Sequence, residues 1–345
     1  MTDTELEEYF VSLGEPKFRA KQVFPRLAEG TPISEMTNLS KKLRERLLEE
    51  TLDTLPRVEA KLTSKIDGTV KYLFRLHDGE CIESVFMRYK HGNTLCISSQ
   101  VGCRMGCRFC ASTIGGKVRD LLPSELLGQI IAAQRDTAER VSNVVMMGIG
   151  EPLDNYDNVV KFLKLVNLPG GLNIGYRHIS LSTCGVVPGI LKLAKVDIPI
   201  TLSISLHAAT DEKRSAIMPV NNKWKIAELL DACVSYYKTT GRRISFEYTL
   251  INGKNDTTED AEELAKLLTD AFRGTGAPIH VNLIRVNEVK ETGFKRGSTE
   301  SANEFAKTLE RRGVVATVRR RLGSDVNAAC GQLRRAGAPG AKDNA

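Results

Sequence analysis

Three cysteines stand close together at Cys103, Cys107 and Cys110. Their C-x3-C-x2-C spacing lets three thiolates on one short loop converge on a soft metal centre, and three ligands on a cubane iron–sulfur cluster leave one iron open for another molecule. A structural zinc site normally takes four protein ligands, and the nearest histidine, His91, lies before the loop at no zinc-finger spacing. The sequence therefore favours an iron–sulfur cluster over structural zinc.

Glu83 and Cys330 are further candidates for chemistry. Within 81–87 a period of two puts Glu83 on the same face as apolar residues, where a carboxylate resists ionisation unless it is paired. Glu83 is thus a candidate proton acceptor, and a structural ion pair is the alternative interpretation. Cys330 is followed by a glycine and lies between arginines, which favours an exposed, thiolate-prone site over inert packing.

Positive charge gathers around Cys330. The chain has 49 Lys and Arg against 42 Asp and Glu, and residues 311–335 hold seven arginines and one acidic residue, Asp325. Guanidinium groups bind phosphate in a bidentate manner, so this arginine cluster favours contact with a polyanion such as RNA. A solvated basic surface is the other interpretation.

Composition limits the class of protein. Eight cysteines in 345 residues are too few for a secreted disulfide scaffold, and the acidic start of the chain does not resemble a signal peptide. No apolar run approaches the ~20 residues of a membrane helix. We therefore expect a cytoplasmic protein with no membrane partner.

Periodicity changes along the chain. Residues 16–52 predict helices, with Asn38 as the cap of an amphipathic segment, and residues 58–99 predict a meander of short strands. Six strand-like runs then alternate with helical segments. The predicted strands are 94–98, 143–147, 178–182, 200–205, 243–250 and 279–284, and the predicted helices are 122–135, 158–166, 225–239 and 258–272. This order predicts an α/β fold, a partial (βα)6 barrel with its chemistry at the C-terminal ends of the strands; a doubly wound open sheet is the runner-up.

The same patterns divide the chain into five regions. We expect a helical accessory domain at 1–55, a β-meander linker region at 56–92, the barrel core at 93–290, a C-terminal extension with the Cys330 loop at 291–335, and a disordered tail at 336–345.

Polar side chains follow the predicted strands at equivalent places. The second strand runs into 148–153, where Gly150 permits close backbone approach and Glu151 offers a carboxylate to an ammonium group. This is not a dinucleotide fingerprint, because a leucine replaces the third glycine. Later strands lead to Ser182, to Ser205-Leu206-His207 and to Asn287. Each signal alone is weak, but their repetition on successive units predicts a site at this end of the barrel.

Two motifs together resemble a known family. The cysteine triplet, with Phe109 before its last member, is similar to the radical S-adenosylmethionine (SAM) signature. Residues 328–333, which contain Cys330, look like the C-terminal motif of the RNA adenosine methyltransferase branch. The resemblance covers about residues 18–333. Of the two subfamilies that share these motifs, 151–155 and 182–185 look more like RlmN than Cfr.

The resemblance implies cofactors and partners. A 4Fe-4S cluster would be held by Cys103, Cys107 and Cys110, and two SAM molecules per turnover would be used. The residues that would bind SAM are Gly150, Glu151, Ser182, Ser205, Leu206, His207 and Asn287. The substrates would be 23S rRNA and tRNA, methylated at C2 of an adenosine (adenosine 37 in tRNA), and the electron donor would be a flavodoxin or ferredoxin.

The resemblance also implies a route. One SAM would methylate Cys330, and a second, cleaved reductively, would give a 5′-deoxyadenosyl radical that takes hydrogen from the new methyl group. The resulting methylene radical would add to adenine, whose C2 is electrophilic and cannot attack a sulfonium methyl as a nucleophile. Glu83 would accept the ring proton, and Cys96 would attack Cys330 in a transient disulfide that releases the base. Two alternatives stay open: a C8 methyltransferase of the Cfr type, and a non-catalytic, zinc-bearing RNA-binding protein.

Overall fold

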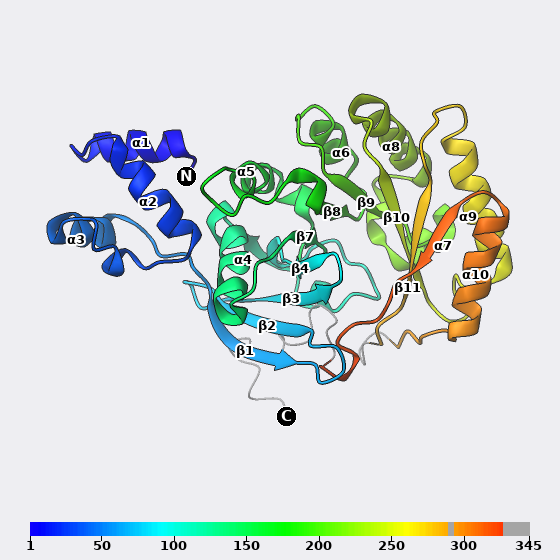
Figure 1. Ribbon diagram of the computed structural model, residues 1–345. Coiled ribbons are helices and arrows are strands. Elements are labelled where there is room, and N and C mark those ends of the chain that lie inside the picture. Colours follow the sequence, from blue (N-terminus) through cyan, green and yellow to red (C-terminus); the bar gives the residue numbers. More distant parts are fainter. Residues whose placement is uncertain (289–292, 327–345) are drawn as a thin grey trace.

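The computed structural model describes residues 1–288 and 293–326, and a ten-stranded sheet dominates this part of the chain (Figure 1). The strands lie in the order β1-β2-β3-β4-β7-β8-β9-β10-β11-β12. Their bounds are Arg57–Thr63, Val70–Arg75, Cys81–Tyr89, Gly92–Cys96, Asn143–Met146, Ile179–Thr183, Thr201–Ser205, Ile244–Leu250, His280–Arg285 and Val315–Val318. Two further strands, β5 (Gln100–Gly102) and β6 (Lys117–Asp120), pair only with each other in the described residues.

The barrel half of the sheet is parallel. From β4 through β7 to β12 each strand pairs with the next in chain order, so this half contains no reversal of strand order. A doubly wound sheet needs such a reversal, and the structure therefore excludes it in favour of the predicted partial barrel. All six predicted barrel strands are present within two residues of their predicted bounds.

Helices cover the outside of this curved sheet (Figure 1). Apolar side chains of the helices, such as Phe162 and Leu229, share one core with outward side chains of the strands, such as Leu181. The helices are α4 (Pro123–Thr137), α5 (Tyr156–Val166), α6 (Val187–Leu193), α8 (Ile226–Thr240), α9 (Thr258–Ala271) and α10 (Thr299–Arg311). A short helix, α7 (Asp211–Ile217), follows β9. Helices α6, α7 and α10 were not among the predicted helices.

The predicted meander extends the sheet. Strands β1 to β4 pair in antiparallel fashion, and β4 then pairs with β7 in parallel, so the meander and the barrel share one continuous sheet. Alternate residues of β2 and β3, among them Tyr72 and Phe86, join the main core under the helices. Val85 and Met87 face the opposite side, where they pack with Cys96 of β4.

Three N-terminal helices form a small unit beside α4 and α5 (Figure 1). They are α1 (Asp3–Ser12), α2 (Phe18–Ala28) and α3 (Lys41–Glu50), and their buried residues make a core of their own. Ser40, and not Asn38 as predicted, caps α3 by accepting the Leu43 N–H. In the described residues no helix combines the length and the apolar character that crossing a membrane requires.

Candidate active site

The three cysteines lie on the loop between β5 and β6. The Cys103 N–H donates to Gly116 O over 3.0 Å and closes the base of the loop, while the Arg108 N–H donates to Ile217 O over 2.9 Å and ties its far end to α7. Cys103 and Cys107 are buried and Cys110 is partly exposed. Their surroundings are apolar, because Cys107 packs with residues such as Met218 in one buried cluster.

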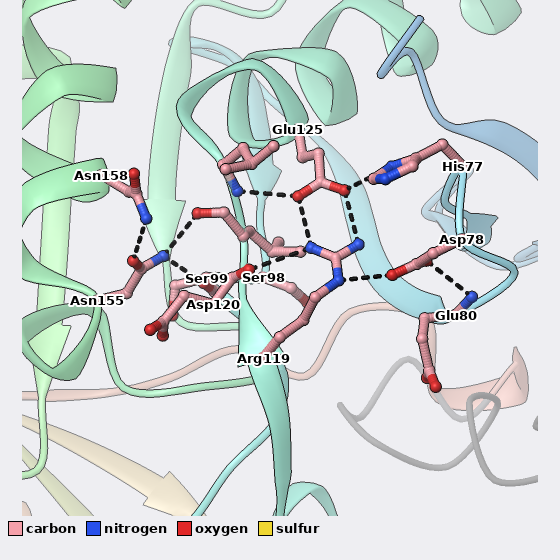
Figure 2. Close-up of polar contacts among 12 residues, drawn as sticks. His77, Asp78, Glu80, Ser98, Ser99, Arg119, Asp120, Glu125, Asn155 and Asn158 are labelled. Carbon is pink, nitrogen blue, oxygen red and sulfur yellow. Dashed lines mark hydrogen bonds and ion pairs between the residues drawn. The ribbon is translucent and has the colours of Figure 1, made fainter. Parts of the chain in front are cut away.

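Strand β6 is fixed to the barrel by Arg119 (Figure 2). Its guanidinium donates to both carboxylate oxygens of Glu125, each over 2.8 Å, and to Asp78 of the β2–β3 turn over 2.6 Å. Glu125 also caps α4 by accepting the Leu122 N–H. Because the Glu125 side chain is fully buried, this bidentate pair holds the strand that leaves the cysteine loop.

A second network joins the cysteine loop to the segment after β7. Asp154 accepts hydrogen bonds from Arg104, from Lys117 over 2.9 Å and from Gln100 over 2.9 Å. The side-chain oxygen of Gln100 in turn accepts the Glu151 N–H over 2.9 Å. These hydrogen bonds therefore connect the loop of predicted metal ligands to Glu151, the predicted SAM contact.

Gly150 and Glu151 occupy the end of β7. Gly150 has φ +107°, and a Cβ atom there would come within 2.6 Å of the Gln100 side chain, so only glycine fits. The Glu151 carboxylate is buried and accepts the N–H groups of Cys184 over 2.7 Å and Leu153 over 3.0 Å. Burial raises the pKa of Glu151, although these hydrogen bonds favour its charged form. A cationic group would complete this buried site.

The ends of β8 and β9 meet beside it. The hydroxyl oxygens of Ser182 and Ser205 lie 3.4 Å apart. His207 has a left-handed backbone, φ +58°, and its Nδ1 accepts the Thr249 N–H over 3.0 Å, so the neutral ring carries its proton on Nε2. Burial, aided by Arg214, lowers the pKa of His207 to about 3. The ring meets Phe109 of the cysteine loop edge-on, with 5.0 Å between the ring centres.

Glu83 and Cys96 lie on another part of the inner face. Cys96 stands opposite Val85 in the β3–β4 ladder, so Glu83 is one residue pair further along the same face. The Glu83 carboxylate is 3.2 Å from the Lys71 ammonium, and both side chains are buried, with exposed fractions of 1% and 0%. The structural ion pair that the sequence left open is therefore present at the predicted proton acceptor.

Ser98 fixes the distance between Cys96 and the cysteine loop. Its N–H donates to Gln129 over 2.8 Å, and its C=O accepts the Gln129 amide over 3.0 Å. Its hydroxyl donates to Glu83 O over 2.6 Å and accepts the Ile149 N–H over 3.0 Å. Strand β3, helix α4 and the segment after β7 all bind this one residue.

The structure says less about Asn287 and Cys330, the remaining predicted site residues. Asn287 is half-buried just beyond β11, next to Val286 of the apolar cluster around Cys107. Cys330 lies outside the described residues. No disulfide links the seven cysteines of the described ranges, so the structure gives no support to the predicted disulfide of Cys96.

Comparison with known proteins agrees with this architecture. The sequence model of the radical SAM superfamily matches residues 97–268, and that of a ribosomal RNA large subunit methyltransferase N-terminal domain matches residues 1–52. A "Probable dual-specificity RNA methyltransferase RlmN" from Clostridium novyi is 52% identical over 96% of this chain and 95% of its own length. The corresponding protein of Alkaliphilus oremlandii is 54% identical over 97% and 96%. The chain belongs to the RlmN family of radical SAM enzymes.

A solved structure supports the same conclusion. The crystal structure of a radical SAM methyltransferase from Sphaerobacter thermophilus superposes with a TM-score of 0.90 at 40% identity, over 96% of this chain and 97% of that one. The RlmN relatives and this structure cover nearly the whole chain, so the accessory helices and the barrel are shared together.

Membership of this superfamily implies a 4Fe-4S cluster and SAM, and the residues present fit both. Burial, with a smaller contribution from the Cys110 thiol, raises the pKa of Cys103 to about 12, so this soft ligand becomes a thiolate when a metal is beside it. In the described ranges no three His, Cys, Asp or Glu side chains converge closely enough for a single metal ion. Three thiols on one short loop suit a cubane cluster, which can take three protein thiolates and leave one iron open, whereas structural zinc normally takes four protein ligands.

Sequence reasoning missed one central residue, Arg214 of α7. It is 1% exposed and donates to Cys184 O over 2.7 Å, Leu206 O over 3.0 Å, Ser205 O over 3.2 Å and Asn221 Oδ1 over 2.9 Å. It therefore joins the ends of β8 and β9. Burial lowers its pKa, and the thiols of Cys184 and Cys107 are its strongest opposing influence. In the sequence it ends the charged run 211–214, which is typical of an exposed helix, so no local signal marked it.

The arginine cluster around residues 311–335 does not act as one surface. Arg311 and Arg312 end α10 and form ion pairs with Glu304 and Glu262 on the outer layer. Arg319 to Arg321 follow β12, at the same end of the barrel as the other strand-end residues. The other two arginines lie outside the described residues.

Proposed function

We propose that the protein methylates C2 of an adenosine in 23S rRNA and in tRNA, with Cys330 as the methyl carrier. Near full-length membership of the RlmN family carries this proposal. It is supported by the gathering of a cysteine loop, a buried carboxylate for an ammonium group and a second carboxylate–thiol face inside one barrel. The same membership favours an enzyme over a non-catalytic RNA-binding protein.

The strand-end residues bind and orient the cofactors in this proposal. Cys103, Cys107 and Cys110 hold the cluster, and Glu151 accepts the ammonium group of SAM. Ser182, Ser205, Leu206, His207 and Asn287 contact the rest of that molecule. When bound, these cofactors supply the one-electron chemistry that carbon 2 of adenine requires, because that carbon is not a nucleophile. The neutral His207 ring offers its Nε2–H as a hydrogen-bond donor without adding charge.

Glu83, Cys96 and Lys71 act on the RNA side. Glu83 accepts the proton that leaves the adenine ring, and the Lys71 ammonium 3.2 Å away holds its carboxylate in place. Cys96 then attacks the sulfur of Cys330, so that a disulfide forms as the bond from that sulfur to the carbon on the base breaks. The carbon takes up a proton to become the methyl group, and the unpaired electron of the adduct returns to the one-electron system that generated it. Reduction of that disulfide returns both thiols. Two SAM molecules are used in each turnover, one of them to methylate Cys330.

The test is a methylation assay under anaerobic conditions on 23S rRNA and tRNA, with mass spectrometry to locate the methyl group on the base. We expect C2 methylation, loss of it in Cys330→Ala, and about four irons per chain in the wild-type protein. Cys103→Ala should lose iron, whereas Cys233→Ala, a buried cysteine of α8, should keep both iron and activity. A product methylated only at C8 would support the Cfr-type alternative, and a colourless zinc protein would refute the proposal.

Two partners belong to the same proposal. A flavodoxin or ferredoxin supplies the electrons, and the basic residues after β12 contact RNA phosphates. RNA affinity should then fall steeply as salt rises, and an affinity indifferent to salt would contradict the phosphate contact.

A further inference from the structure

The chain segment after β12 crosses to the opposite edge of the sheet. The Gly323 N–H donates to Asp67 Oδ2 over 2.9 Å, and the Lys65 N–H donates to Asp325 Oδ2 over 2.9 Å. The two bonds join residues more than 250 positions apart and run in opposite directions. Strands β1 and β12 are the two edges of the sheet, so this contact links the open edges of the barrel.

The β1–β2 turn is built to present Asp67. Asp67 Oδ1 accepts the Thr69 N–H over 3.0 Å within the turn, which leaves Oδ2 directed at Gly323. The buried Ser64 hydroxyl accepts the N–H groups of Ile66 and Asp67. Burial opposes ionisation of Asp67, but the backbone hydrogen bonds from Gly323 and Thr69 outweigh it and lower its pKa to about 2. The Oδ1 bond within the turn orients Oδ2 toward Gly323, and the bond from Gly323 in turn favours the ionised carboxylate.

The docked segment has matching geometry. Gly323 is buried with φ +59°, and residues Ser324–Val326 form a single 3-10 turn that returns the Asp325 carboxylate to Lys65. Leu322 packs on the cluster of Val85, Met87 and Cys96. One side of the segment thus binds the turn, and the other covers the face that carries Cys96.

The reach of Cys330 follows from this docking. Cys330 lies four residues beyond Val326, the last residue of the docked turn. An extended chain spans at most about 3.5 Å per residue, so Cys330 stays within about 14 Å of Val326. Without the two hydrogen bonds the tether would begin near Val318, the last residue of β12, and its span would be three times as long. A longer tether lowers the effective concentration of the thiol at its target.

We propose that Asp67 and Asp325 are positioning residues that dock the C-terminal segment on the β1–β2 turn and thereby present Cys330 to the face of Glu83 and Cys96. The inference rests on the proposed methyl-carrying role of Cys330. It assigns a role in the reaction to a surface turn that contributes no group to the chemistry.

Hydrogen exchange resolved to single amides tests the docking in the cluster-loaded protein. Asp325→Ala should speed exchange at the Lys65 amide about ten- to a hundredfold, and Asp67→Asn should speed exchange at the Gly323 amide, since a hydrogen bond to a charged group is lost or weakened. The control is Asp53→Ala, which removes a carboxylate that accepts only a local N–H, that of Leu55. Unchanged Lys65 exchange in Asp325→Ala would overturn the docking.

The rate of Cys330 methylation in a single turnover tests the positioning. We expect about a tenfold loss in Asp325→Ala, partial recovery in Asp325→Asn, which keeps a carbonyl acceptor, and unchanged iron content and SAM affinity. Equal methylation of Cys330 in wild type and Asp325→Ala would overturn the positioning role alone. Wild-type protein that never methylates Cys330 would instead overturn the proposed function, and the positioning role with it.

Discussion

Replacement of Lys71 by methionine is the sharpest test of the inner face. The change keeps a side chain of similar length but removes the ammonium group 3.2 Å from the Glu83 carboxylate. At an effective dielectric constant of about 20, a pair at this distance interacts by about 5 kcal/mol. Both side chains are buried, so solvent does little to screen the loss. Breaking a buried ion pair by removing one partner typically costs about 3–5 kcal/mol, so urea unfolding of the metal-free Lys71→Met protein should show a loss of that size.

Lys71→Met leaves the buried Glu83 carboxylate without the cation beside it, so the proposed base loses the partner that holds it in position. We expect methylation of RNA to fall by about 10²-fold, because a positioned general base typically contributes about 10²- to 10⁴-fold. The assay is the rate of RNA methylation, with SAM binding measured in parallel.

Two companion variants separate charge from packing. Lys71→Arg keeps the positive charge and should retain most of the activity at pH 7. Lys71→Met/Glu83→Gln should recover the stability lost in Lys71→Met but none of its activity. A Lys71→Met enzyme with wild-type rates would refute the reasoning that Lys71 holds the base in position.

Three further predictions concern stability and SAM binding. Arg119→Lys keeps the charge but cannot bind both Glu125 oxygens and Asp78. Urea unfolding of the metal-free protein should therefore show a loss of about 1.5–3 kcal/mol in the free energy of unfolding, and reconstitution should give less iron. The exposed Arg273→Lys is the control, and an equal loss in both variants would argue against the network. Arg214→Gln should weaken SAM binding by tenfold or more in equilibrium dialysis, because it releases the ends of β8 and β9 from each other, and unchanged binding would show that these ends hold without it. The pKa of Asp67 is about 2 in the folded protein and 3.8 ordinarily, so its contribution is complete above about pH 5 and is lost as pH falls through 4 toward 2. The gap in melting temperature between wild type and Asp67→Ala in metal-free protein should close over that range, and a constant gap would contradict the lowered pKa.

The sequence predicted the barrel because its signals are local. A strand such as β10 alternates apolar and polar residues with a period of two, and the helices that follow have a 3.6-residue period. The cysteine loop and the polar residues at strand ends are also short motifs whose meaning depends on neighbours in the chain.

Residues that act across long distances were not predicted. Arg214 joins two strands to a helix and looks like part of an exposed charged run in the sequence. The contacts of Asp67 with Gly323 and of Asp325 with Lys65 connect opposite ends of the chain. Lys71 was within reach of sequence reasoning, because a hairpin turn at Asp78 places it diagonally across from Glu83 on one face. The ion pair follows once that register is known.

The hydrogen bonds that surround Ser98 limit how the length of the segment from Cys96 to Cys103 can change. Six residues lie between Cys96 and Cys103, and one of them, Ser98, is hydrogen-bonded to Glu83, Gln129 and Ile149. This segment is therefore a spacer of fixed length between the thiol and the metal loop. A single inserted residue could not be absorbed as a bulge without breaking bonds to three elements at once. The two halves of the site can diverge in sequence, but the interval between them cannot be lengthened or shortened independently of either.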